Sequence, residues 1–458
     1  MRFVSCLFVL LFPLFANAAK SQIMDPASAA ASSAWPKVDV PKQLTLERAE
    51  EILLRNNLTV TAARYGVEVA RAQKLIAALR PNPTVTLGGE QLDIGHPFHN
   101  VFSTDSNTAA NRVYTYRFDQ IIERGDKRRL RTDAADFQLQ AAEAQVLDAT
   151  RQQVFQLKQA FYTAVLAREN LRVADENLCL ANNTEQLIKL HVDTGDTAEW
   201  ELTKFQANKV QYQRDLISAQ LSYQQSVRDV LNLLGAQPSS VTGTTPVGGP
   251  DQMPQLLADA PIEVIGDLRI EPLNKPLVEL RATAIDNRPD IIAARRNVEA
   301  AQRSVRLAYS LRHRDIDVAA EYQRNGGENT IGIVITVPLF LHNNHQGEIN
   351  QALAQLQQTK AQLAQAELQA MTEVDKAYRA YESSQEMLGV YKRETLQKAE
   401  ESFRIAGVSY KEGATSLLEL RDAQRTYNQT RVASNQAHFD YRMSLYQLEL
   451  ATGKTLLK

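Results

Sequence analysis

The side chains of this sequence that could take part in catalysis or metal binding are few and lie far apart. His96 and His99 stand three residues apart in a polar loop, a spacing that could bind a metal ion, although an ordinary surface loop is the interpretation that we favour. His342 and His345 stand where a predicted strand gives way to a helix, and we expect a solvent-exposed turn there. No Ser/His/Asp arrangement, P-loop or GxGxxG with the right flanks occurs. The sequence therefore predicts no enzyme, no cofactor and no metal centre.

Composition and charge exclude further classes of protein. The formal net charge of -2 is too close to neutral to argue for nucleic-acid binding. Glycine and proline are sparse, at 19 and 16 of 458 residues, which favours long helices over a compact α/β enzyme. Cys6 falls in the leader described next, so Cys179 stands alone in the mature chain. An intrachain disulfide and a multi-cysteine metal site are thereby excluded.

Residues 1–18 have the pattern of a secretory signal peptide. Arg2 supplies the positive end, residues 3–15 the apolar core, and Ala16-Asn17-Ala18 the small-residue cleavage site. The alternative is an uncleaved anchor, and Cys6 comes too early to be a lipoprotein cysteine. Residues 19–43 predict an extended arm, and no apolar run of 18 residues follows the leader, so we predict no transmembrane helix.

Two similar stretches centred on glycine lie between long segments that almost lack glycine and proline. They are residues 193–202 and 411–422. Glycine commonly ends a helix, and Thr415 or Ser416 could cap the next one, so each stretch predicts that a long helix reverses direction. Before the first turn, residues 126–194 show apolar side chains at steps of three and four, typical of a coiled coil. The corresponding residues are Gly195 and Gly413, Thr197 and Thr415, Glu201 and Glu419, and Leu202 and Leu420.

The whole chain contains two copies of one pattern. A shift of 231 aligns Asn56 with Asn287, whereas a shift of 217 aligns Ala160 with Ala377, so the first copy is longer, and we place its extra residues in the loop between its two strands. We predict a first repeat over residues 44–235, a linker over 236–275, a second repeat over 276–453 and a tail over 454–458. Within the first repeat, helix is expected from residue 44 to about 80, where Pro81-Asn82-Pro83 stops it.

Each copy contains two segments in which apolar and polar residues alternate, and each pair of segments predicts a β-hairpin. The segments are residues 84–87 and 113–119 in the first copy, and residues 315–323 and 330–337 in the second. Asn325-Gly326-Gly327 predicts the tight turn of the second hairpin. Four strands cannot close around a wet interior, and open strand edges do not occur in lipid. The strands therefore belong either to a soluble sheet on a core or to a barrel shared by several chains. The apolar faces contain Tyr114, Tyr116, Phe118, Ile316, Val318, Ile331, Ile333 and Ile335, and the polar faces contain Arg117, Asp317 and Glu321.

This order of elements, given twice after a signal peptide, resembles the TolC family of outer-membrane efflux channels. Residues 337–340 and 343–349, together with Pro81-Asn82-Pro83, are most similar to the heavy-metal (cobalt–zinc–cadmium) branch. The resemblance implies a mainly α fold with a small membrane β part. Long coiled-coil helical hairpins would form a periplasmic tunnel, and two β-hairpins from each of three chains a twelve-stranded barrel. The lipobox cysteine that many members of that branch carry is absent here.

The resemblance also implies roles for the turns and for the faces of the strands. It implies adaptor-docking tips at Thr194, Gly195, Thr197, Gly413 and Thr415. Glu419 and Asp422 would ring a narrow, cation-favouring entrance, unless they merely belong to a solvated helix face. In the first copy Glu201 keeps the acid, but Lys204 replaces Asp422, so that helix would pair charges instead. The apolar strand faces would contact lipid and the polar ones the lumen.

The implied function is a passive exit duct in the outer membrane, extending into the periplasm, for small molecules or metal cations. The implied partners are two further copies in a homotrimer, a periplasmic adaptor (membrane fusion) protein, an inner-membrane pump of the RND type and outer membrane lipid. The alternatives are a type I protein secretion duct and a non-conducting coiled-coil protein of the envelope.

Overall fold

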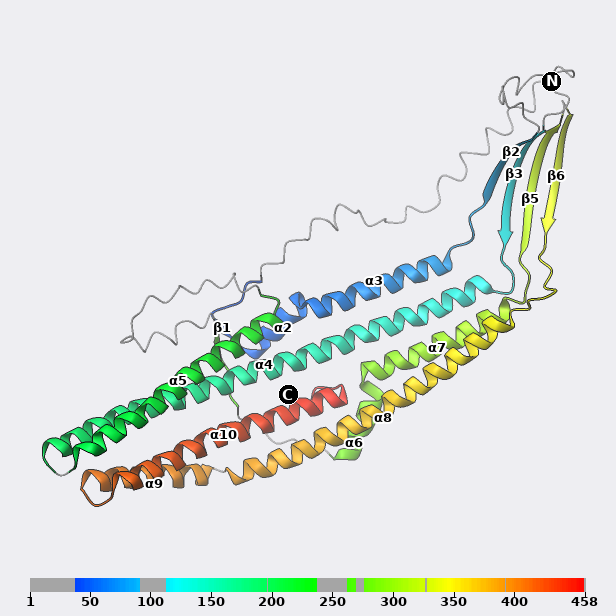
Figure 1. The fold of residues 1–458 in the computed structure, drawn as a ribbon. Helices are drawn as coiled ribbons and strands as arrows, with labels where there is room; N and C mark the ends of the chain where they lie inside the picture. The colour runs from blue at the N-terminus through cyan, green and yellow to red at the C-terminus, as the bar shows by residue number, and fades with distance from the viewer. Residues whose placement is uncertain are drawn as a thin grey trace, which may run out of the picture.

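The computed structural model describes residues 38–90, 113–195, 197–236, 262–268, 276–325, 328–391 and 393–456. Long helices dominate, and a four-stranded sheet lies at one end of the molecule (Figure 1). The predicted signal peptide, His96, His99 and the Gly326-Gly327 turn lie outside the described residues.

The elements of the first half follow the predicted order of helix, hairpin, long helix, turn and helix. They are β1 (Gln43–Leu44), α2 (Leu46–Asn56), α3 (Leu58–Ala78), β2 (Thr84–Glu90), β3 (Val113–Ile122), α4 (Lys127–Asp193) and α5 (Glu199–Leu233). The second half repeats this order with β4 (Glu263–Val264), α6 (Leu277–Asn287), α7 (Pro289–Ser310), β5 (Ile316–Asn325), β6 (Glu328–Thr336), α8 (Gln346–Val390), α9 (Arg393–Lys411) and α10 (Leu417–Thr452). The domain boundaries themselves stay predictions.

The long helices confirm the predicted runs, with two interruptions that the sequence did not reveal. α4 has 67 residues, or about 100 Å at 1.5 Å per residue. The single helix expected over residues 44–80 is wrong, because it breaks at Asn57. The Asn57 side chain accepts the N–H of Val60 at 3.0 Å and so caps α3, while its amide donates to the carbonyl of Leu233 at 2.9 Å. The second long helix is divided between α8 and α9, two residues after Gly389.

The helices form one curved layer, and different helices make up its two ends. Near the strands the neighbours are α3, α4, α7 and α8, and near the turns they are α5, α4, α10 and α9. α4 runs through both parts, and the two helical turns lie together at the end far from the sheet (Figure 1). α5 packs mainly on α4, and α9 mainly on α10, so these two helices are the free edges of the layer.

The four-stranded sheet joins the two hairpins side by side in the order β2-β3-β5-β6, with every pair antiparallel. β3 and β5 come from different halves of the chain and pair from Val113 opposite Asn325 to Ile122 opposite Ile316. The short strands β1 and β4 form a separate parallel pair.

The main core lies midway along α4, where α2, α5 and the β1–β4 pair pack around Phe161 and Leu157. Beside it, Lys158 bonds Glu449 at 3.0 Å and lies 3.7 Å from Glu50. Burial raises the pKa of the Glu50 carboxyl, the Lys158 ammonium lowers it, and the negative charge of Glu449 raises it. Together these effects leave the pKa of Glu50 above its ordinary value. This network joins the C-terminal helix α10 to both α2 and α4.

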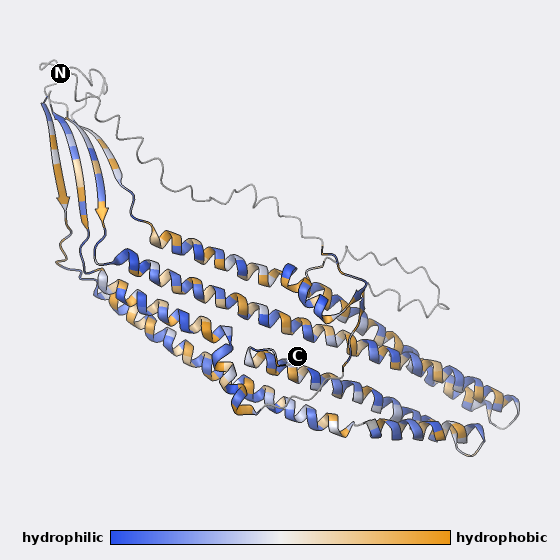
Figure 2. Ribbon diagram, turned by 180° about the vertical axis from the view of Figure 1, so that it is seen from behind, coloured by the Kyte–Doolittle hydropathy of each residue, from blue (hydrophilic) through white to orange (hydrophobic). Residues whose placement is uncertain are grey.

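Hydrophobic and hydrophilic residues are mixed along the helices (Figure 2). Within the described residues, none of the helices combines the length and the apolar character that crossing a membrane requires.

Candidate functional site

The end of the molecule far from the sheet is built from two tight helical turns. Gly195 and Gly413 have φ values of +83° and +73°, in the left-handed region that favours glycine, as the repeated stretches predicted. Of the two proposed capping residues, Ser416 is the N-cap of α10, and its Oγ accepts the N–H of Glu419 at 3.4 Å. In the first turn, the Thr194 hydroxyl donates to the carbonyl of Leu190 at 3.1 Å.

A small cluster of buried side chains holds the two turns together. Tyr410 of α9 is only 7% exposed and packs with Ala181, Ile188, Phe205 and Leu420 from the three other helices. Burial, followed by the nearby negative charge of Glu201, raises the pKa of the Tyr410 phenol. We call these five residues the tip cluster. Sequence reasoning missed Tyr410, because its partners lie on other helices.

The predicted gate acids lie together on one exposed face of α10. Glu419 and Asp422 are three residues apart, so they are neighbours on the helix surface. Glu419 accepts a hydrogen bond from the hydroxyl of Thr415. Asp422 pairs with Arg425 at 2.6 Å, a pair so exposed that it contributes at most about 1 kcal/mol. Within one chain the two acids therefore differ, since only Asp422 has a cationic partner among the described residues.

The corresponding residues of α5 have different surroundings. Glu201 is half-buried and faces the tip cluster through Tyr410. Lys204 is exposed, and its Nζ lies 5.3 Å from the centre of the Trp200 ring, a cation–π contact. In the described part of the chain, no carboxylate lies within ion-pair distance of Lys204, so the charge pair expected on this helix is not formed within one chain.

A polar groove of about 720 Å³ runs between α4, α5 and α10, above the turns. Asp422 and Arg425 line it on one side. The amide oxygens of Asn177 and Asn428, also in its lining, are buried and have no hydrogen-bond partner among the described protein atoms. A buried acceptor without a donor is costly, so the groove favours water or a polar group from a partner.

The strand faces predicted from the sequence each come together in the sheet. The register places Tyr116 opposite Tyr322, and Tyr322 opposite Ile331. All the predicted apolar residues thus share one side, where Val85 and Leu87 of β2 extend the patch. On the other side, Arg117 lies opposite Glu321 and bonds Asp119 at 2.6 Å. A long row of exposed apolar side chains on one face is unusual for a chain surrounded by water.

The histidines at the strand-to-helix bend differ from each other. His342 is exposed, as expected, whereas His345 precedes α8 with φ +57° and its Nδ1 lies 3.2 Å from Glu348 Oε1. A backbone hydrogen bond of Glu348, then the bond from His345, hold the pKa of the Glu348 carboxyl below its ordinary value. No group of three potential metal ligands occurs among the residues that the structure describes.

Long helical hairpins that carry a small sheet with one apolar face are the fold of the outer membrane channels. The sequence pattern of the family described as "Outer membrane efflux protein" matches residues 51–236 and 280–454. The chain belongs to this family. It is an outer membrane protein, the channel component of an efflux system.

Similar proteins agree with this assignment. The cobalt-zinc-cadmium resistance protein CzcC of Cupriavidus metallidurans is 24% identical over 394 residues, 85% of each chain. The pyoverdine export outer membrane protein OpmQ of Pseudomonas putida is 22% identical, over 89% of this chain and 84% of that one. Among solved structures, the Campylobacter jejuni CmeC outer membrane channel has a TM-score of 0.70 at 18% identity, covering 89% of this chain and 85% of that chain. CusC has a TM-score of 0.69 at 18% identity, covering 92% and 95%.

Proposed function

We propose that three copies of this chain form the outer membrane duct of a tripartite efflux system, with the sheets in the bilayer and the helices in the periplasm. The observation that carries the proposal is the position of two unlike surfaces at opposite ends. The sheet exposes Ile331, Ile333 and Ile335 at one end, and two polar helical turns lie at the other (Figure 1).

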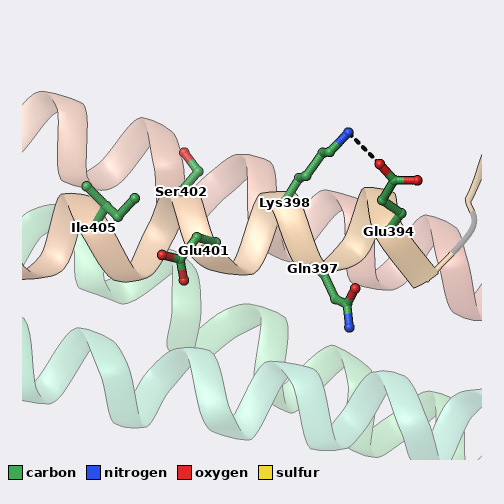
Figure 3. A pocket seen from close by; sticks show the side chains of 6 residues that line it. All are labelled: Glu394, Gln397, Lys398, Glu401, Ser402 and Ile405. Carbon is green, nitrogen blue, oxygen red and sulfur yellow. Dashed lines mark ion pairs between the residues drawn. The ribbon is translucent and has the colours of Figure 1, made fainter.

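The free edges of the helical layer support the proposal of a ring. Exposed apolar side chains lie on both edge helices: Val210, Ile217 and Leu221 on α5, and Ile405 and Val408 on α9. Beside Ile405, a shallow depression of about 470 Å³ is bordered by polar and charged side chains of α9 (Figure 3). A rotation that sets α5 of one copy against α9 of the next covers both edges at once, and repeating it closes a ring.

In this proposal the chain does no chemistry and takes energy from an inner-membrane pump of the RND type. A periplasmic adaptor would bind the turns around Gly195 and Gly413, and the unpaired acceptors Asn177 and Asn428 would take hydrogen bonds from it. Residues 1–18 would be removed on export. Glu419 and Asp422 would line the entrance, with the Arg425 partner of Asp422 lowering the negative charge there.

We further propose divalent metal cations as the cargo, because of the similarity to CzcC and because paired acids at an entrance favour cations. Deleting the gene in its host should sensitise the cells to cobalt, zinc or cadmium. Sensitivity to organic toxins alone would indicate another small-molecule cargo, and loss of a secreted protein would indicate a type I secretion duct.

The architecture is tested by fractionation and mass. The protein should be recovered from outer membranes in detergent with the mass of three chains, and should conduct ions in planar bilayers. A soluble monomer recovered without detergent after signal removal would contradict the proposal. Assembly without conductance would instead favour the structural role.

A further inference from the structure

The apolar face of the four-stranded sheet ends, on the side of the helices, at two arginines. Ile122 of β3 and Ile316 of β5 are the last paired residues, and they lie opposite each other. If the same register continues by two residues, Arg124 lies opposite Arg314.

Two contacts support this continuation. A Cβ atom on Gly125 would lie 2.7 Å from the ring of His313, so residues 125 and 313 still face each other beyond the strands. The backbone N–H of Arg124 donates to Asp315 Oδ1 at 2.9 Å, which also keeps the two chain segments together. Arg124 and Arg314 lie between the contact of residues 125 and 313 and the last paired residues.

Alternation along each strand then gives the side of the sheet. Residues two apart on a strand point to the same face, so if the alternation also continues to residues 124 and 314, just beyond β3 and β5, Arg124 follows Ile122 and Arg314 follows Ile316 onto the apolar side. Both arginines are exposed. The Arg314 guanidinium lies 5.6 Å from the centre of the Phe340 ring, and Leu339 and Leu341 beside it are 68% and 78% exposed.

The carboxylates near the two arginines in the described part of the chain are engaged elsewhere. The nearby Asp315 carboxylate accepts from Lys127 at 2.8 Å and from the backbone of Arg124. Within the described residues, no carboxylate lies within ion-pair distance of either guanidinium. Like charges opposite each other on antiparallel strands are destabilising, so an anion from outside the chain would stabilise this pair.

We propose that Arg124 and Arg314 together bind the phosphate of an anionic phospholipid in the periplasmic leaflet, while Leu339 and Leu341 contact its acyl chains. This inference rests on the proposed function, in which the apolar face lies in the bilayer. Guanidinium groups bind phosphate through paired hydrogen bonds, and basic side chains at the end of an apolar face reach the headgroup region. The site takes a glycerophospholipid of net negative charge.

The test uses the full chain, purified from membranes in detergent and first shown to be assembled. The shift of its thermal unfolding midpoint is measured against added phosphatidylglycerol, phosphatidylcholine or inorganic phosphate. The wild type should bind phosphatidylglycerol roughly 25-fold more tightly than phosphatidylcholine, at about fivefold per arginine, and inorganic phosphate should have little effect.

The double variant Arg124→Gln with Arg314→Gln should bind both lipids equally. The matched control, Arg55→Gln with Arg379→Gln, removes two exposed arginines from helices α2 and α8 and should keep the preference. Equal binding of the two lipids by the assembled wild type would overturn the inference even if the variants fail to fold, as would an undiminished preference in the double variant. An equal shift of the unfolding midpoint with inorganic phosphate would contradict a lipid ligand and would indicate that the site binds a free phosphate ion. If the wild type does not assemble in membranes, the proposed function itself fails.

Discussion

Replacing Ile333 by arginine tests the proposed placement of the sheet in lipid. Ile333 is the middle of three isoleucines on the apolar face of β6, lies opposite Ala320 and is 77% exposed. Since it packs against so little in the chain, Ile333→Arg should change the stability of the isolated chain by less than about 0.5 kcal/mol. The cost should appear only on entering the bilayer.

That cost is about 2–4 kcal/mol for an arginine near the bilayer midplane, and it is paid in each copy. Each chain should therefore insert roughly 30- to 700-fold less favourably. The fraction assembled in outer membranes, measured by the mobility of unheated samples in detergent gels, should fall steeply, while secretion of the chain should be unchanged.

Gly332→Arg is the matched control, because it lies at the same depth on the other face. A Cβ atom added there meets no atom within 4 Å and the position lies opposite Glu321, so assembly should be close to wild type. If Ile333→Arg assembles normally and Gly332→Arg does not, the assignment of the two faces is reversed. Normal assembly of both variants would mean that neither face contacts lipid.

Three further predictions concern the helices. Glu419→Gln with Asp422→Asn should reduce cation selectivity and block by multivalent cations in planar bilayers, whereas Lys204→Ala should change selectivity less. Unchanged selectivity in the double variant would make the acids ordinary surface residues. Tyr410→Ala should destabilise the tip cluster by about 3 kcal/mol, detected as faster proteolysis at the turns, and Tyr410→Phe should resist cleavage nearly as wild type does. Because the pKa of Glu50 is raised on folding, its contribution to stability is greatest below the unfolded pKa near 4.5 and is lost as the pH rises through the folded value. Glu50→Gln should therefore be neutral or stabilising at pH 7, and a large loss in chemical denaturation would contradict this.

The parts of the fold that could be predicted are those set by local pattern. A run without glycine or proline over residues 126–194 predicts α4 almost to the residue, because nothing in it interrupts backbone hydrogen bonding. The alternation of apolar and polar residues predicts the faces of the strands, since successive side chains of a strand point to opposite faces. Glycine predicts both helical turns, because the chain there adopts a left-handed conformation.

The features that could not be predicted depend on distant partners. Asn57 caps α3 through the nearby N–H of Val60, but its hydrogen bond to the carbonyl of Leu233 joins residues far apart in the sequence. The effect of the Glu201 charge on the pKa of Tyr410 likewise depends on how α5 and α9 are placed at the tip. The ion pair of Asp422 with Arg425 was open to prediction, since the two lie three residues apart on a helix.

The two edge helices, α5 and α9, are held to the molecule with unequal strength. α5 buries eight side chains, continuing from the tip to the main core. Among the described side chains of α9, Tyr410 alone is buried, and the helix is separated from α8 by a break. Since burial of apolar area supplies most of the free energy of packing, less free energy holds α9 in place than α5. In the proposed duct, a partner bound at the tip would therefore displace α9 more easily than α5, and it would have to break the tip cluster around Tyr410.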